Sequence, residues 1–283
     1  MGLAEVEILD KETTPLSSDH SSGKLTFVYP FTECEGYVQV AEQLSLKGLA
    51  GPTMEETANL VYSTFQNPEG RYSGEVLSKL KYLSSWLWAF NGLLSTKSGV
   101  YIQDDPKISD DGEVLMDQLE LENKIKEGDT SVRFVPRGYK TGRQTSSELS
   151  KNTFVKALAG EEGAQKLAEI ADKYPQDPYV GRPGSISLSG IEVCILEAYV
   201  SFFSQKESLQ ISVDNGFGSG RGYARGCALG ISNPKRGVQI LNSQKIKEAR
   251  ERTIARWTAF FNLARHPFYG LLPGEDIPNF RDK

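Results

Sequence analysis

The sequence predicts an α+β fold in which a mostly helical N-terminal half is followed by an antiparallel β-meander packed by a C-terminal amphipathic helix. Three observations predict this fold. Apolar residues recur at helical spacing through much of the first half, after recognisable helix-capping residues. Strand-like alternation begins near Ser185. A final apolar stripe at helical spacing covers residues 246–264.

Helix starts are the clearest local signals in the first half. Residues 37–46 have a helical pattern that stops at Gly48. Thr53 stands three residues before Glu56, the spacing of a capping box, and the helix that it starts should end at the dipeptide Asn67–Pro68. A shorter helix is expected at residues 73–82.

Strands are expected on both sides of this helical region. Residues 25–29 alternate well enough for a strand, and residues 86–94 with 100–102 predict a hairpin. The acidic stretch at 104–129 should be part loop and part helix, the helix covering about 113–127. Residues 131–139 should be extended.

A second capping box marks the start of the helices that precede the meander. Thr145 and Glu148 have capping-box spacing, and helical character then continues to Tyr174, with an interruption near Gly160. Pro175 should end it. The meander itself is predicted from the apolar alternation at 191–195, 199–204, 209–213, 228–232 and 238–241.

Domain boundaries are weakly marked. Residues 1–23 are rich in polar residues and predict a flexible tail. A mainly helical acidic region with a hairpin should occupy 24–128, followed by a basic α+β region at 129–283, unless the two form one continuous domain.

The net charge of −5 conceals a strong asymmetry along the chain. Residues 1–130 contain 10 Lys and Arg against 22 Asp and Glu, whereas residues 131–283 contain 22 against 15. From 215 to 247 there are six basic residues and no acidic residue. This asymmetry indicates either an anionic partner for the basic half, such as nucleic acid or an acidic protein surface, or attraction between the two halves.

The strongest candidate site is the glycine- and arginine-rich segment 216–226, which we call the Gly/Arg segment. Glycine permits tight turns and close approach of a ligand, and arginine presents a fork of donors suited to phosphate or carboxylate. The segment 133–143 also mixes cations, aromatic residues and glycines, a combination suited to single-stranded nucleic acid. The expected ligand-binding residues are Arg221, Tyr223, Arg225, Arg137, Arg143, Gly218 and Gly220.

Several familiar chemistries are excluded by the residues themselves. The two histidines, His20 and His266, are far apart, and no Cys-x-x-Cys sequence occurs, so a His/Cys zinc site is not expected. The acidic run at 104–113 does not fit an EF-hand, because Lys107 would fall at the first ligand position. A P-loop is absent, and the glycines of 216–220 are followed by a strand pattern instead of the helix that binds a dinucleotide. We therefore expect neither a metal nor a cofactor.

The compartment follows from the cysteines and from the absence of targeting signals. The three cysteines are too few and too scattered for a disulfide framework, which indicates a reducing environment. The first residues lack a secretory signal, and no apolar run is long enough to cross a bilayer. A soluble cytoplasmic protein with no membrane contact is the expectation.

Three functions remain open. The leading hypothesis is a non-enzymatic binding or assembly protein whose basic C-terminal half engages an anionic partner. The second is a purely structural protein–protein interaction module that uses the Gly/Arg segment as an adaptable tip. The third is an enzyme acting on a phosphorylated or carboxylated small molecule, with Arg221 and Arg225 as anion clamps and Asp214 or Glu192 as acid or base.

Overall fold

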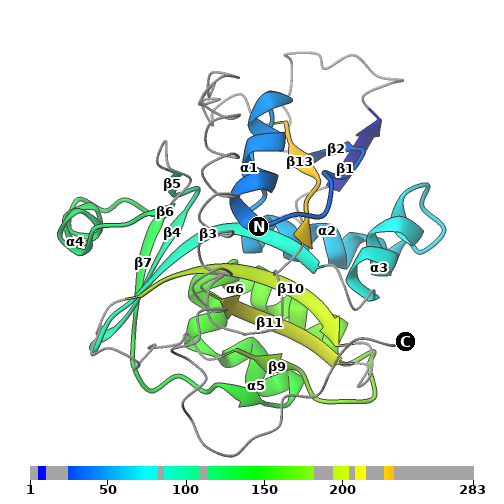
Figure 1. Cartoon of the computed structure of the whole chain (residues 1–283). Coiled ribbons are helices and arrows are strands. Elements are labelled where there is room, and N and C mark those ends of the chain that lie inside the picture. The colour runs from blue at the N-terminus through cyan, green and yellow to red at the C-terminus, as the bar shows by residue number, and fades with distance from the viewer. Residues whose placement is uncertain are drawn as a thin grey trace, which may run out of the picture.

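A computed structural model of the chain describes residues 6–10, 25–81, 86–108, 114–181, 194–203, 208–214 and 226–232 (Figure 1). Both helices and mixed sheets are present, which gives the α+β class. The helices are α1 (Tyr37–Leu46), α2 (Met54–Gln66), α3 (Ser73–Lys81), α4 (Gln118–Lys126), α5 (Ser146–Lys151) and α6 (Thr153–Ala171). The strands are β1 (Val6–Asp10), β2 (Leu25–Tyr29), β3 (Trp86–Ser95), β4 (Gly99–Asp104), β5 (Lys107–Ile108), β6 (Val114–Leu115), β7 (Val132–Pro136), β8 (Gly142–Arg143), β9 (Tyr179–Val180), β10 (Cys194–Phe203), β11 (Ser208–Asp214), β12 (Gly226–Cys227) and β13 (Gly230–Ile231).

An eight-stranded sheet is the centre of the fold. Its order is β7-β4-β3-β10-β11-β9-β8, with β12 paired to the first residues of β3. Neighbouring strands are antiparallel except for β9 with β11 and β12 with β3. A smaller sheet has the order β1-β2-β13, and β5 pairs with β6. Helix α2 lies against β3 and β10, and α6 lies against β7 and β11.

Strand β3 is buried on both faces, which explains its nearly continuous apolar sequence. Leu87 and Ala89 belong to the main core, which includes residues of α2 and α6. Trp88 and Phe90 point the other way, into a second core beneath α1. There Tyr37 contacts both rings, with centroid distances of 5.6 Å and 4.8 Å. The N-terminal half, expected to be mostly helical, thus also supplies β3 and β4, two neighbouring strands of the large sheet.

The two predicted capping boxes and the predicted interruption near Gly160 are confirmed. Both capping boxes form, at Thr53 with Glu56 and at Thr145 with Glu148. Gly160 has φ 74° and breaks α6, as its position in the sequence predicted. Helix α4 begins later than expected because the side chain of Asp117 caps it, while the residues before it form β6.

Of the predicted meander, the described residues contain only the first hairpin. Strands β10 and β11 form an antiparallel pair, but the next two strands leave it. β12 pairs with β3 in parallel, and β13 pairs with β2 in the smaller sheet. The expected strand at 238–241 and the helix at 246–264 lie outside the described residues, so the proposed packing of the sheet by that helix stays a prediction.

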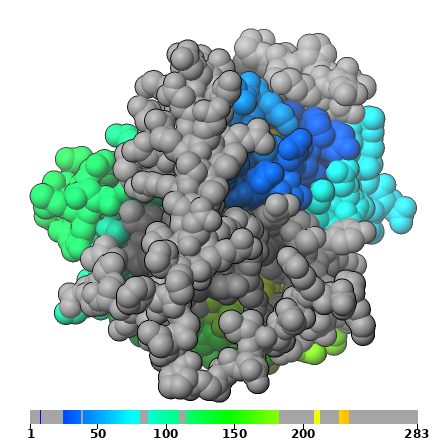
Figure 2. Space-filling view, viewed as in Figure 1, coloured from blue at the N-terminus to red at the C-terminus, as the bar shows by residue number. Residues whose placement is uncertain are grey.

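Three further features complete the description. Within the segment expected to be a flexible tail, β1 pairs in parallel with β2. Helix α4 protrudes as a separate lobe, on the side of the molecule away from α3 in Figure 2. Among the described helices, none has the length and apolar character needed to cross a membrane.

Candidate functional site

Of the seven predicted ligand-binding residues, the structure describes two. Arg137 follows β7, and Arg143 lies in β8. The five residues of the Gly/Arg segment lie outside the described part of the chain and remain predictions: Gly218, Gly220, Arg221, Tyr223 and Arg225. Of the two candidate acids, Asp214 is the last residue of β11, opposite Glu197 of β10, and Glu192 is outside the described residues.

The topology brings Arg137 and Arg143 toward the same side of the molecule. β7 and β8 are the two edges of the large sheet. Seven strands in a flat sheet would place these edges about 29 Å apart, at about 4.8 Å per strand. The chain from Pro136 to Gly142 spans at most about 22 Å when fully extended. The sheet must therefore curl, and its two edges approach each other through the short connection that starts at Arg137 and leads into β8, where Arg143 lies.

The guanidinium group of Arg137 donates most of its hydrogen bonds to the turn between β3 and β4. Its Nε donates to the Thr96 carbonyl at 3.1 Å, and its Nη2 donates to the same carbonyl at 2.6 Å and to the Ser95 hydroxyl at 2.7 Å. Its backbone N–H donates a hydrogen bond to the Ser98 carbonyl at 3.0 Å. The residue remains exposed, and its Nη1 has no hydrogen bond among the described residues. Arg137 thus has a structural role that the sequence did not indicate.

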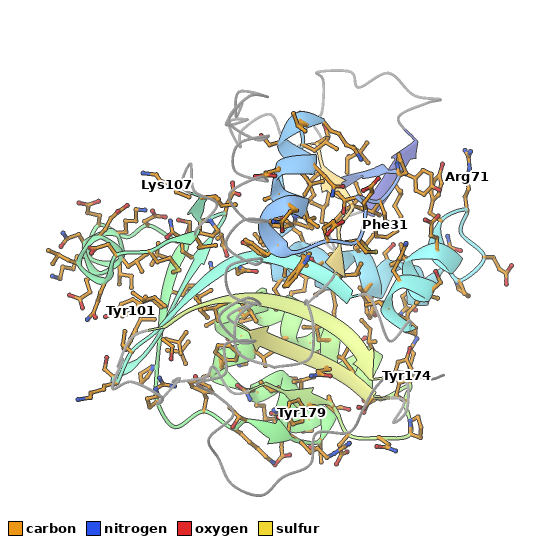
Figure 3. All side chains as sticks on the ribbon, in the orientation of Figure 1. Phe31, Arg71, Tyr101, Lys107, Tyr174 and Tyr179 are labelled. Carbon is orange, nitrogen blue, oxygen red and sulfur yellow. The ribbon has the colours of Figure 1, made fainter. Side chains whose placement is uncertain are left out.

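Arg143 has a different environment, beside an exposed aromatic ring. It is the direct antiparallel partner of Tyr179 in β9, so the two side chains project from the same face of the sheet. The next residue, Val180, is fully buried and fixes which face is exposed. Tyr179, which is labelled in Figure 3, is 39% exposed, and within the described residues no ring stacks on it. Arg143 donates one long hydrogen bond, of 3.3 Å, to the Asp177 carbonyl.

The segment around this pair is basic, and half of its cations are ion-paired: Arg133 with Asp104, Lys140 with Glu148, and Lys156 with Glu161. Residues 131–156 contain six basic residues and one acidic residue. Lys140 pairs with Glu148 at 2.7 Å, and both side chains are about half exposed, so the pair contributes little to stability. Within the described residues, Arg143 and Lys151 make no ion pair. The arrangement suits a negatively charged group next to a planar one.

A polar cluster that the sequence did not predict lies at a bulge in β3. The register between β3 and β10 shifts between Glu197 and Ala198, which leaves Phe90 and Asn91 of β3 without partners in β10. Asn91 is fully buried; its amide oxygen accepts from the backbone N–H of Met54 at 2.7 Å, and its amide nitrogen donates to Asp104 at 2.6 Å.

Arg133 completes this cluster from β7. Its guanidinium donates to both carboxylate oxygens of Asp104, with an Nη1–Oδ2 distance of 2.7 Å. Its Nε donates to the carbonyl of Ala157 in α6. The neighbouring Asp105 has φ 51°, an unusual conformation for a non-glycine residue. The cluster joins α2, β3, β4, β7 and α6 through side chains from distant parts of the sequence.

Glu55 borders the cluster at the start of α2. Partial burial of its carboxyl group raises its pKa, and Asp104 and Glu56 raise it further, whereas Arg133 opposes them. The residue as a whole is exposed. No group of three or more His, Cys, Asp or Glu residues within the described ranges has the geometry to hold a metal ion. With Asp104 paired to Arg133, we interpret this cluster as a structural junction.

Comparisons with known proteins add no functional information. No protein-family model matches the sequence, and comparisons with curated proteins and with solved structures found no match. The functional inference therefore depends on the chemistry of the residues. The exposed Tyr179 beside Arg143 is the most informative feature that sequence reasoning missed. Tyr179 in β9 pairs with Arg143 in β8, more than 30 positions away in the sequence, and no local sequence pattern indicates this pairing.

Proposed function

We propose that the protein is a non-enzymatic binding protein whose basic C-terminal half engages an anionic partner, and that single-stranded nucleic acid is the partner class that best fits. The observation that supports the proposal is the pairing of Arg143 with the exposed ring of Tyr179. An acidic protein surface would require only the cations. A base, in contrast, also gives the exposed ring a partner, because aromatic side chains stack on bases without regard to sequence.

In this proposal each residue type has a separate task. The guanidinium of Arg143 pairs with a backbone phosphate, and the ring of Tyr179 stacks on an adjacent base. Arg137 contributes charge through the part of its guanidinium that the turn does not use. We extend the same roles to the Gly/Arg segment, with Arg221 and Arg225 on phosphates and Tyr223 as a second stacking ring.

The test is a fluorescence-anisotropy titration of the full chain with a labelled single-stranded DNA of mixed sequence, at two salt concentrations. Removing one phosphate contact with Arg143→Ala should make the salt dependence shallower by about 0.7 in the log–log slope. Loss of one stacked base in Tyr179→Ala should weaken binding by about 1–3 kcal/mol, or about 5- to 150-fold. The matched control is Lys126→Ala, an exposed lysine on α4, which should change neither quantity.

Two results would reject the nucleic-acid proposal. Absence of binding at low salt removes it, since phosphate contacts are strongest there. Binding of polyglutamate with the same affinity as DNA, unaffected by Tyr179→Ala, would instead favour an acidic protein partner.

We place the protein in the cytoplasm on the basis of its cysteine content, and fractionation of cells that express the tagged chain would check this.

A further inference from the structure

Two cysteines that are 193 positions apart in the sequence lie side by side in the fold. Glu35 and Gly226 form an antiparallel bridge in which each backbone N–H donates to the other residue's carbonyl, at 3.0 Å and 2.9 Å. Cys34 and Cys227 are the next residues outward, so they occupy a non-hydrogen-bonded pair position. The Cα atoms of such a pair are about 4.5 Å apart, within the range that a disulfide spans.

The surrounding contacts hold both segments in place. Beyond the cysteines, the backbone N–H of Thr32 donates to the Ala228 carbonyl at 3.0 Å, and the backbone N–H of Ala228 donates to the Thr32 hydroxyl at 3.0 Å. On the other side, Trp88 Nε1 donates to the Glu35 carbonyl at 3.0 Å. Because backbone bonds flank the pair at both ends, the two cysteines are held side by side.

The two thiols differ in their environment. Both are free, and they share a hydrogen bond. Cys227 is fully buried in the main core, whereas Cys34 is partly exposed at its margin. Burial raises the pKa of the Cys227 thiol well above its usual range, and the neighbouring Cys34 adds to this, whereas Lys79 opposes it. An oxidant therefore reaches Cys34 first.

We propose that Cys34 and Cys227 form a reversible dithiol–disulfide couple that exchanges with low-molecular-weight disulfides. The Cys34 thiol loses its proton, and its sulfur attacks one sulfur of the small disulfide, which releases the first small thiol. The Cys227 thiol then loses its proton and attacks Cys34, releasing the second small thiol. Two protein thiols are oxidised to one disulfide, and one small disulfide is reduced to two thiols.

The couple fixes the position of a segment that follows the Gly/Arg segment directly. Cys227 comes two residues after Arg225 and pairs with Leu87 of β3. A disulfide to Cys34 would link this point covalently to the residues that lead into α1. This proposal does not depend on the anion-binding function, because it rests only on the geometry of the two thiols.

The test uses the full chain and glutathione disulfide as the oxidant, followed by acid quench, alkylation and mass spectrometry. We expect the loss of two free thiols per chain, measured as two alkyl groups fewer than on the reduced chain, and a linked peptide that contains residues 34 and 227. Dithiothreitol should restore both thiols.

Two single variants separate the steps. Cys227→Ser should stop at a glutathione adduct on Cys34, and Cys34→Ser should leave Cys227 unmodified over the same time. A wild-type chain that accumulates the adduct without forming the internal bond would overturn the proposal. So would a chain whose two thiols both remain unreacted, or one whose linked peptide contains Cys194 in place of either partner. Because the main measurement uses the wild-type chain, it tests the proposed disulfide even if a variant fails to fold.

Discussion

Replacing Asn91 by alanine tests whether the bulge in β3 is held by its buried amide. In the native fold this one side chain satisfies two polar groups, the first backbone N–H of α2 at Met54 and a carboxylate oxygen of Asp104. Asn91 is fully buried, so water cannot easily replace it. The variant Asn91→Ala leaves both groups without this partner.

The expected loss follows from the two bonds. A hydrogen bond to a charged acceptor contributes about 1.5–3 kcal/mol, and one between neutral groups about 0.5–1.5 kcal/mol. The sum is about 2–4.5 kcal/mol, a large part of the stability of an ordinary domain. The measurement is urea unfolding followed by tryptophan fluorescence, since Trp88 in the same strand is buried. Asn123→Ala, on the exposed surface of α4, is the control and should change stability by less than about 0.5 kcal/mol.

A nearly isosteric variant, Asn91→Asp, separates the two bonds. One of its oxygens can still accept from Met54, but the other faces Asp104 without a proton to donate. Near neutral pH the two carboxylates repel, and one of them acquires a raised pKa in the folded state. The folded chain then binds a proton more readily than the unfolded chain, so the deficit should be full near pH 7 and shrink as pH falls toward 4.

The outcome that refutes this reasoning is specific. If Asn91→Asp is as stable as the wild type at pH 7, the amide donor to Asp104 contributes nothing. A deficit that stays constant down to pH 4 would show that repulsion between carboxylates is not its cause. An Asn91→Ala loss below about 1 kcal/mol would mean that water or a neighbouring group satisfies the bulge.

Two further predictions concern the same junction. Gly160→Ala should lower the free energy of unfolding by about 1–3 kcal/mol, because φ 74° with ψ 167° is a conformation open almost only to glycine and the new methyl group would lie 3.1–3.3 Å from the carboxylate atoms of Glu55; Gly74→Ala, in the open part of α3, should instead be neutral or stabilising in the same urea titration. Glu55→Gln should stabilise the fold at neutral pH, where the carboxylate with a raised pKa is charged, and the gain should vanish below about pH 4, where the group is protonated in both the folded and the unfolded chain. Thermal unfolding at a series of pH values measures it, and a gain that persists in acid would contradict the electrostatic cause.

The elements that sequence alone predicted are those whose stability is local. The capping box at Thr53 and Glu56 and the break at Gly160 depend on hydrogen bonds and dihedral angles within a few residues, and both formed as expected. The hairpin of β3 and β4 was predicted for the same reason, since its strands are joined by a short turn. None of these three predictions required knowledge of the rest of the chain.

The candidate site was predicted less well, because its residues come together through non-local pairing. Arg143 was selected for its charge, but only the register of β8 on β9 places it beside Tyr179. Arg137 was selected on the same grounds, yet its guanidinium caps the Thr96 carbonyl in a turn 41 positions away. The presence of an arginine in a sequence does not reveal whether its hydrogen-bond donors already have partners within the fold.

By itself the sequence determined the two capping boxes, the break at Gly160, the charge asymmetry and the exclusion of the common metal and nucleotide motifs, because each depends on residue types at fixed short spacings. Tertiary structure decided that β12 and β13 leave the meander for β3 and β2, and that Cys34 meets Cys227. These pairings are chosen by which apolar faces can be buried together, a property of the whole chain that no local window of residues contains.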